Sequence, residues 1–253
     1  MGAVFAITAT KASMPRWQTR PTMGINWERF GAALAVGAVG GLAPGLTRLA
    51  SRSGVTDAEI AQALPGDDLV AGAGHVIDRA ATIPAPGATV WPWRVQLGKG
   101  RAGWYFPRWV ELAIPRGRRG LRTIDPALLT LSPGQRVPDW GPGDPQFEVA
   151  LIEAEHALVY LSLRQKSRNW TWPDGTDPVP GDVLAFSWAL VLAPIGEAHS
   201  RLHLRLRMRT ARERSPAMFL GELFDWVTVA LLFAGLRERV GNAPVADLGS
   251  IPS

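Results

Sequence analysis

Hydrophobic and polar residues alternate most strictly between positions 201 and 209. The apolar set is Leu202, Leu204, Leu206 and Met208, and the set between them is Arg201, His203, Arg205, Arg207 and Arg209. Successive side chains of a β-strand point to opposite faces, so this run predicts a strand buried on one face and solvated on the other. We expect His203 to be exposed, and we expect Arg205→Ala to change stability by less than about 0.5 kcal/mol.

Shorter runs predict the other elements. Five further strands are expected over residues 75–83, 135–140, 146–153, 156–163 and 183–192, because these runs are bounded by turn residues and rich in strand formers. Pro92 and Pro107 suit the first turns of two short helices over 90–97 and 106–114, where a missing N–H costs nothing. Thr56 followed by Glu59 predicts a capping box in another short helix within 53–64.

The last strongly patterned element is a helix that begins at Ser215 and Pro216 and runs to about Val240. Residues 227–236 are apolar on nearly every side, which is typical of a helix buried all round. Glu222 and Asp225 share one face of it, and we interpret them as solvated rather than catalytic. Reading 216–236 as a membrane span would cost roughly 2.5 to 3.5 kcal/mol for a central aspartate, so we prefer a helix packed on the sheet.

The N-terminal fifty residues have no such pattern. Residues 31–45 are uncharged and rich in glycine, but as a helix they would reach only about 22 Å, short of the ~30 Å hydrocarbon core. Residues 31–46 therefore either associate with a membrane or form a surface-packed or disordered segment. Met14 and Met23 are alternative starts, so residues 1–22 could be an extension of the gene model.

Composition narrows the function. Of the 253 residues 47% are hydrophobic, which allows a substantial core, and cysteine is absent. Disulfides, thiolate nucleophiles and cysteine-ligated metals are therefore excluded, and a cytoplasmic location is expected, with membrane association through the N-terminal segment as the alternative. The net charge of +5 is dispersed, so we expect no nucleic-acid partner. The histidines show no ligand spacing, and we predict no metal and no cofactor.

The arginine face of 201–209 is the sharpest concentration of charge. Our main interpretation is a solvated sheet surface. The alternative is an anionic partner, such as a membrane surface or an acidic protein, because neighbouring like charges are relieved by a counter-charge.

Local sequence adds a family resemblance. The segments are PGDDLV at 65–70, IPAP at 83–86, VWPW at 90–93 and LGKGRAGWY at 97–105. With the order strand, two short helices, antiparallel strands and long helix, they resemble the SRPBCC or START-like superfamily, in particular its polyketide cyclase/dehydrase-like bacterial members. The resemblance implies an α+β helix-grip fold, a curved antiparallel sheet around the C-terminal helix. It divides the chain into an N-terminal extension (1–50), a short helix and linker (51–74), a helix-grip domain (75–240) and a tail (241–253).

The resemblance also implies a function. Members of the superfamily typically hold apolar molecules between the sheet and the long helix, so we expect a lipid-like or polyketide-like small molecule as partner. One alternative is a cyclase-, dehydratase- or hydrolase-like enzyme that uses the same cavity; the other is a membrane-associated accessory protein whose cavity is filled by its own side chains. No catalytic motif is shared across the superfamily, so no catalytic residue can be carried over to this chain. Whether the protein is an enzyme stays open, with a binding protein preferred, and a homo-oligomer stays open.

Six residues are predicted to bind the ligand. Trp104 and Tyr105 follow a glycine-rich turn where the rim of the cavity is expected, and they could stack on a flat ligand or close the core instead. The others recur at helical spacing on the long helix and are taken as the face turned to the sheet: Trp226, Ala230, Phe233 and Arg237. On this assignment, Ala230→Trp would fill the cavity.

Overall fold

A single, mostly antiparallel sheet organises the molecule. The computed structural model describes residues 52–141, 143–173, 183–209 and 216–241, the side chains of 216–221 excepted. In this part of the chain, seven strands form one sheet in the order β1-β2-β7-β6-β5-β4-β3. The strands are β1 (Arg52–Ser53), β2 (His75–Ile83), β3 (Arg136–Pro138), β4 (Gln146–Glu153), β5 (Ala157–Gln165), β6 (Val183–Ile195) and β7 (His199–Arg209). Neighbouring strands pair antiparallel, except that β1 runs parallel to β2.

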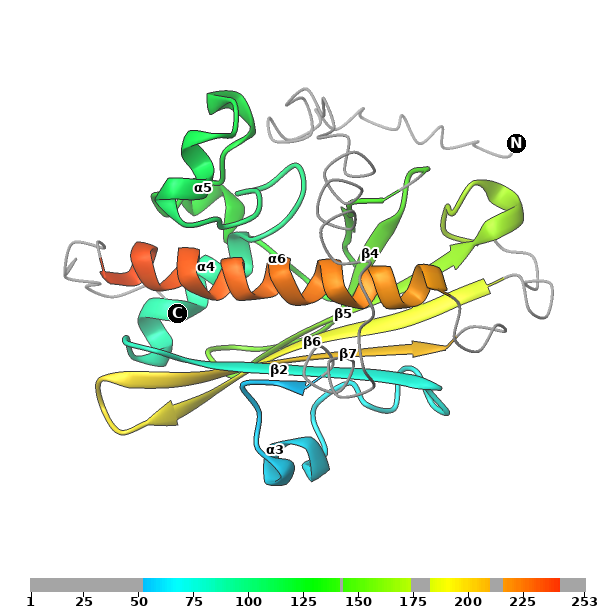
Figure 1. Ribbon diagram of the computed structural model, residues 1–253, viewed down its shortest axis with the longest axis horizontal. Coiled ribbons are helices and arrows are strands. Elements are labelled where there is room, and N and C mark those ends of the chain that lie inside the picture. The colour runs from blue at the N-terminus through cyan, green and yellow to red at the C-terminus, as the bar shows by residue number, and fades with distance from the viewer. Residues whose placement is uncertain (1–51, 142, 174–182, 210–215, 242–253) are drawn as a thin grey trace, which may run out of the picture.

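The helices cover the sheet on both sides. The long helix α6 (Pro216–Gly241) lies along one face, which we call the inner face, and α3 (Asp57–Ala61) lies on the opposite, outer face (Figure 1). Between β2 and β3 come α4 (Gly87–Gln96), α5 (Arg108–Leu112) and the 3-10 turns η2 (Arg116–Arg118) and η3 (Pro126–Leu128); η4 (Lys166–Arg168) follows β5. This order confirms the predicted α+β helix-grip fold.

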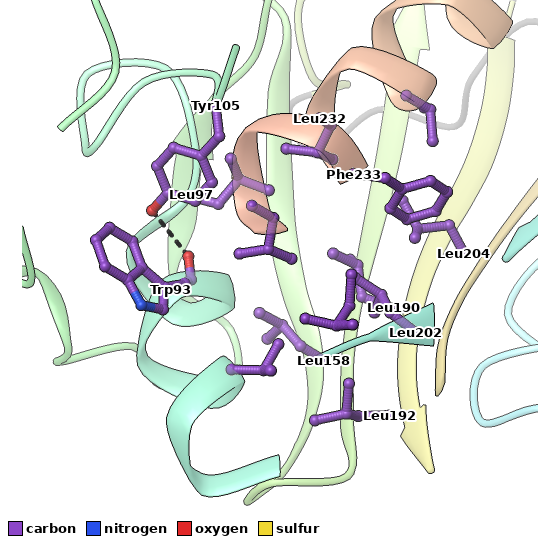
Figure 2. Packing of buried hydrophobic residues seen from close by; sticks show 14 of the residues in the cluster. Trp93, Leu97, Tyr105, Leu158, Leu190, Leu192, Leu202, Leu204, Leu232 and Phe233 are labelled. Carbon is purple, nitrogen blue, oxygen red and sulfur yellow. Dashed lines mark hydrogen bonds between the residues drawn. The ribbon is translucent and has the colours of Figure 1, made fainter. Parts of the chain in front are cut away.

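The core lies between α6 and the inner face. Leu158, Leu190 and Leu204 are direct cross-strand partners on β5, β6 and β7, and each is at most 2% exposed. Leu232 and Phe233 of α6 pack over them (Figure 2). The predicted inward direction of the β7 leucine face is confirmed, because strand periodicity sends its apolar side chains to this core.

The C-terminal half of α6 approaches the chain after α4 very closely. A Cβ built at Gly235 would lie 2.3 Å from the carbonyl oxygen of Tyr105, so only glycine fits there without a shift. Arg239, 2% exposed, donates to the Phe106 carbonyl oxygen at 3.0 Å and to the Glu111 carboxylate at 2.6 Å. These contacts fix the end of the helix on the loop that carries α5.

The outer face corrects the prediction of a solvated arginine stripe. Arg205 is 3% exposed, and it donates to Asp78 Oδ1 at 2.7 Å and to Asp67 Oδ2 at 2.8 Å. His203, predicted to be exposed, is 5% exposed, with its Nε2 2.7 Å from Asp78 Oδ1. Buried cations need paired carboxylates, and two acids on other elements supply them.

Residues 54–72 form the cover of this outer face, and we call them the clasp. Glu59 of α3 accepts hydrogen bonds from Arg201 at 2.6 and 2.9 Å, while Leu64 packs on Val159 and Val191. Thr56 and Glu59 make the predicted capping box. With β1 paired to β2, the region expected to be a linker belongs to the sheet and its cover.

The predicted element positions hold, and their ends shift by a few residues. The strands over 75–83 and 146–153 agree with β2 and β4, β6 extends to Ile195, and α5 is shorter than the expected 106–114. The helix expected over 90–97 begins earlier, at Gly87, so Pro92 lies inside α4 and not in its first turn, which corrects that prediction. The expectations for residues 1–50, the membrane segment 31–46 included, lie outside the described residues, as do those for the tail beyond Gly241.

Candidate ligand-binding site

A cavity of about 300 Å³ opens between the sheet and α6. Its position follows from the strand pairing. Two residues along the strands from the row of Leu158, Leu190 and Leu204, the cross-strand partners are Tyr160, Trp188 and Leu206. The row after that contains Phe186 and Met208. The remaining lining residues are Leu97, Gly98, Trp104, Val137, Pro138, Asp139, Trp140, Phe147, Arg164, Leu184 and Asp225. A second hollow of about 240 Å³ adjoins it and shares Trp104, Asp139, Trp140 and Asp225.

The walls are mainly aromatic. Trp188 stacks on Trp104 with ring centroids 6.0 Å apart and on Tyr160 at 6.1 Å, and Trp140 meets Trp104 edge to face at 5.5 Å. The Trp104 indole N–H donates to the Thr228 carbonyl oxygen of α6 at 3.1 Å. That hydrogen bond ties the aromatic wall to the helix and satisfies the only polar atom of the Trp104 side chain.

One end of the cavity is polar. Arg164 forms an ion pair with Asp139, and its guanidinium carbon lies 4.2 Å from the centroid of Phe186. Lys99 Nζ donates to the Asp139 carbonyl oxygen at 2.7 Å. Burial raises the pKa of Asp139, and the charge of Arg164 opposes that shift. The pair therefore places a polar, overall neutral group beside an apolar surface.

Asp225 provides a second carboxyl group at the cavity. It accepts from Arg79 Nε at 2.7 Å, and its side chain is 32% exposed. Burial raises the pKa of Asp225, whereas Arg79 lowers it. Glu222, one turn earlier, lies 2.6 Å from His75 Nε2. Both acids thus bind β2 and are not merely solvated, which corrects the sequence interpretation.

The Tyr160 hydroxyl is a further polar group of the lining. Tyr160 is 4% exposed, and burial raises its pKa to about 12, so the phenol stays protonated at neutral pH. A protonated phenol can donate a hydrogen bond to a ligand oxygen or to a water molecule.

The six predicted residues do not come together. Trp104 lines the cavity, but Tyr105, 1% exposed, is core: it packs edge to face on Trp93 and donates its hydroxyl to the Trp93 carbonyl oxygen at 2.9 Å (Figure 2). Phe233 is also buried in the core and is not among the residues that line the cavity. Of the two uses foreseen for Tyr105, the structure has core closure.

Three of the four helix residues predicted to face the sheet are exposed instead, which corrects that prediction. Ala230 is exposed, Trp226 is 37% exposed, and Arg237 is exposed with its Nε donating to the Thr82 carbonyl oxygen at 3.0 Å. The face turned to the sheet carries Val229, Leu232, Phe233, Leu236 and Val240. A helix that is apolar on nearly every side has no periodic signal to orient it, so the choice of face depends on packing.

Sequence reasoning also missed the main lining residues. The alternation of β5 and β6 could have found Tyr160 and Trp188, because each lies two residues from a core leucine on the same strand face. No comparable signal marks Asp139 and Arg164, which are 25 positions apart and meet only in the fold.

Two negative observations bear on the described residues alone. Among them no cluster of three or more His, Cys, Asp or Glu side chains is placed to hold a metal ion. Among their helices none combines the length and apolar character that crossing a bilayer requires.

Comparison with known proteins gives only distant matches to solved structures. No protein-family model and no curated protein matches the sequence. Solved structures do match. A Mesorhizobium loti protein is 18% identical over 68% of this chain and 100% of that chain, with a TM-score of 0.37. Norcoclaurine synthase from Thalictrum flavum, whose structure is in complex with dopamine and hydroxybenzaldehyde, is 12% identical over 68% of this chain and 89% of that chain, with a TM-score of 0.38. Ara h 8.0201 is 12% identical over 66% of this chain and 97% of that chain, with a TM-score of 0.36.

These structural neighbours are SRPBCC, or Bet v 1-like, proteins. The helix-grip assignment of this chain stands on its own strand order and on the place of α6. Structural similarity at these TM-scores does not indicate which ligand this chain binds or which activity it has.

Proposed function

We propose that the protein binds a small, flat, largely apolar molecule in the cavity between the sheet and α6. The observation that carries the proposal is the lining itself: stacked aromatic rings from β4, β5 and β6 enclose about 300 Å³, with a few polar groups at one end. Small-molecule sites are commonly apolar clefts with a small number of convergent polar groups, and this volume lies at the lower end of their range.

The lining also favours a class of ligand. Indole and phenol rings offer stacking surfaces to a planar molecule, and the Tyr160 hydroxyl and the Asp139–Arg164 pair offer hydrogen bonds to an oxygen substituent. The cavity charge is balanced, so a neutral ligand costs less to bury than an ion. An aromatic or polyketide-like molecule with hydroxyl or carbonyl groups suits this site better than a saturated lipid chain.

A dye-binding titration tests the cavity. Wild-type protein should enhance the fluorescence of an environment-sensitive naphthalene dye, and Met208→Trp should weaken that binding by at least about tenfold, because a larger side chain would occupy the space between β7 and α6. The matched control is Ala230→Trp, which adds the same ring on the exposed face of α6 and should bind as wild type does. Both variants should unfold cooperatively.

Two outcomes would contradict the proposal. If the wild type binds no dye, the cavity is closed by its own side chains, and the filled-cavity alternative replaces the open one. If Met208→Trp binds unchanged while Ala230→Trp does not, the ligand occupies a different place. Native mass spectrometry of protein purified without detergent would identify any molecule that remains bound.

Asp225 favours an enzyme as the second candidate function. A carboxyl group whose pKa is raised by burial, with its side chain partly open to the cavity, suits general acid or base work. Arg79 already pairs with it, which argues for a structural role instead. Mass spectrometry of a bound molecule before and after incubation distinguishes carriage from conversion.

A further inference from the structure

The two most exposed large apolar side chains of the described residues both belong to α5. Trp109 is 68% exposed and Leu112 is 72% exposed. They stand three residues apart in a helix, so they point to the same side of it. Single exposed apolar residues are ordinary, but an aromatic and an aliphatic side chain side by side form a joint apolar patch. Neither candidate function uses this patch.

The patch lies in a strongly basic segment. Residues 107–123 contain five arginines and a single acidic residue, Glu111. Glu111 is 3% exposed, and its two carboxylate oxygens accept from Arg239 at 2.6 Å and from Arg122 at 2.8 Å, so it offers no counter-charge at the surface. The exposed arginines of the segment are Arg108, Arg116 and Arg118.

We propose that α5 and η2, residues 108–118, dock on an anionic lipid surface. A tryptophan ring sits favourably at the depth of lipid headgroups, and a neighbouring leucine can enter the acyl boundary. Arginine side chains keep their guanidinium groups at the phosphates while their stems lie along apolar surface. Aromatic, aliphatic and basic side chains therefore act together at one membrane interface.

The shape of the segment favours a membrane over an acidic protein. Figure 1 shows α5 and its loop standing out from the fold beside the C-terminal half of α6. Stable protein interfaces bury about 800 Å² on each partner, which two side chains on a projecting turn do not supply. Shallow insertion into a lipid interface needs no partner surface of matching shape.

The proposal is independent of the ligand cavity. The Arg108 backbone N–H donates to Glu238 Oε2 at 2.8 Å, whereas the cavity reaches α6 at Asp225. Thirteen residues of helix separate these positions by about 20 Å. Docking through α5 would hold the protein at a membrane without covering the cavity.

Vesicle flotation of the full chain tests the docking. The wild type should float with vesicles of phosphatidylcholine containing one third phosphatidylglycerol, bind phosphatidylcholine alone less, and be released by added salt. Trp109→Ser with Leu112→Ser, and separately Arg116→Ser with Arg118→Ser, should each weaken binding at least about tenfold. Ile195→Ser, which removes another exposed aliphatic side chain, 45% exposed on the β6–β7 hairpin, should bind as wild type does.

All substituted side chains are exposed, so unchanged circular dichroism and melting should verify the fold of each variant. Absence of wild-type binding to anionic vesicles would overturn the proposal. So would full binding by the Trp109→Ser and Leu112→Ser double variant, because the membrane contact would then lie elsewhere, for example in residues 1–51.

Discussion

Arg205 is the residue whose environment departs furthest from its sequence pattern. It lies on the outer face of β7, yet its guanidinium group is buried between Asp78 and Asp67 and also donates to the carbonyl oxygens of Gln62 and Ile60. Burial opposes the charged form of Asp78, but hydrogen bonds from His203 and Arg205 prevail and lower its pKa. Removing the arginine would leave two carboxylates without their main counter-charge.

We therefore expect Arg205→Ala to lower the free energy of unfolding by about 3 to 5 kcal/mol, instead of the small change that the alternation suggested. Urea unfolding at neutral pH measures it. Arg209→Ala is the matched control, because Arg209 is on the same strand face but exposed, and it should change stability by less than about 0.5 kcal/mol. Equal, small effects for both variants would show that the Arg205 network adds nothing.

At the scale of elements, α6 depends on one close approach. Gly235→Ala should improve helix propensity by about 1 kcal/mol. The new Cβ, however, would lie 2.3 Å from the Tyr105 carbonyl oxygen and 2.6 Å from the Phe106 carbonyl carbon, which are backbone atoms and cannot rotate away. We expect a net loss of about 1 to 3 kcal/mol in thermal or urea unfolding.

Gly241→Ala separates the two effects of that substitution. Gly241 ends α6, and a Cβ there would meet nothing within 4 Å. Its replacement should be neutral or mildly stabilising. Stabilisation by Gly235→Ala would mean that α6 can move away from the loop before α5 at little cost.

The clasp forms an ion pair with β7, between Glu59 and Arg201, whose contribution to stability depends on pH. Hydrogen bonds from Arg201 hold the pKa of Glu59 at about 2, below its ordinary 4.5. A carboxyl group with a lowered folded-state pKa stabilises the fold above its unfolded pKa, and this contribution is lost as the pH falls from about 4.5 through about 2.

Glu59→Gln should therefore destabilise the protein at pH 7 by on the order of 1 kcal/mol, since the pair is partly solvated, and the difference from wild type should vanish towards pH 2. Urea unfolding across this pH range measures it. Asp57→Asn removes a carboxylate from the same helical turn without touching Arg201, and it should not reproduce this pH dependence. A difference that persists unchanged at low pH would contradict the ion-pair explanation.

At the scale of the whole molecule, the two faces of the sheet are closed by different means. The inner face packs apolar side chains under α6 and leaves a cavity where the leucine row gives way to aromatic rings. The outer face pairs its arginines and His203 with acids of the clasp and of β2. The proposed ligand site lies on the inner face of the sheet, and the proposed membrane contact lies on α5.

The sequence by itself determined the local elements and their order. Period-two alternation defined β7, and the Thr56–Glu59 spacing produced the capping box, because each signal acts over a few residues. That order, with the local motifs, was sufficient to predict the helix-grip fold. The glycine-rich turn before Trp104 also suggested that this residue lies at the cavity.

Only the tertiary structure decided which residues meet. The Asp139–Arg164 and Arg205–Asp67 pairs join positions far apart in the chain, and no local pattern encodes such partners. The alternation of β7 predicted two different faces but could not tell solvent from a clasp that supplies carboxylates. The face of α6 was likewise open, because its apolar residues surround the helix and only packing against β5, β6 and β7 leaves Ala230 outside and Leu232 inside.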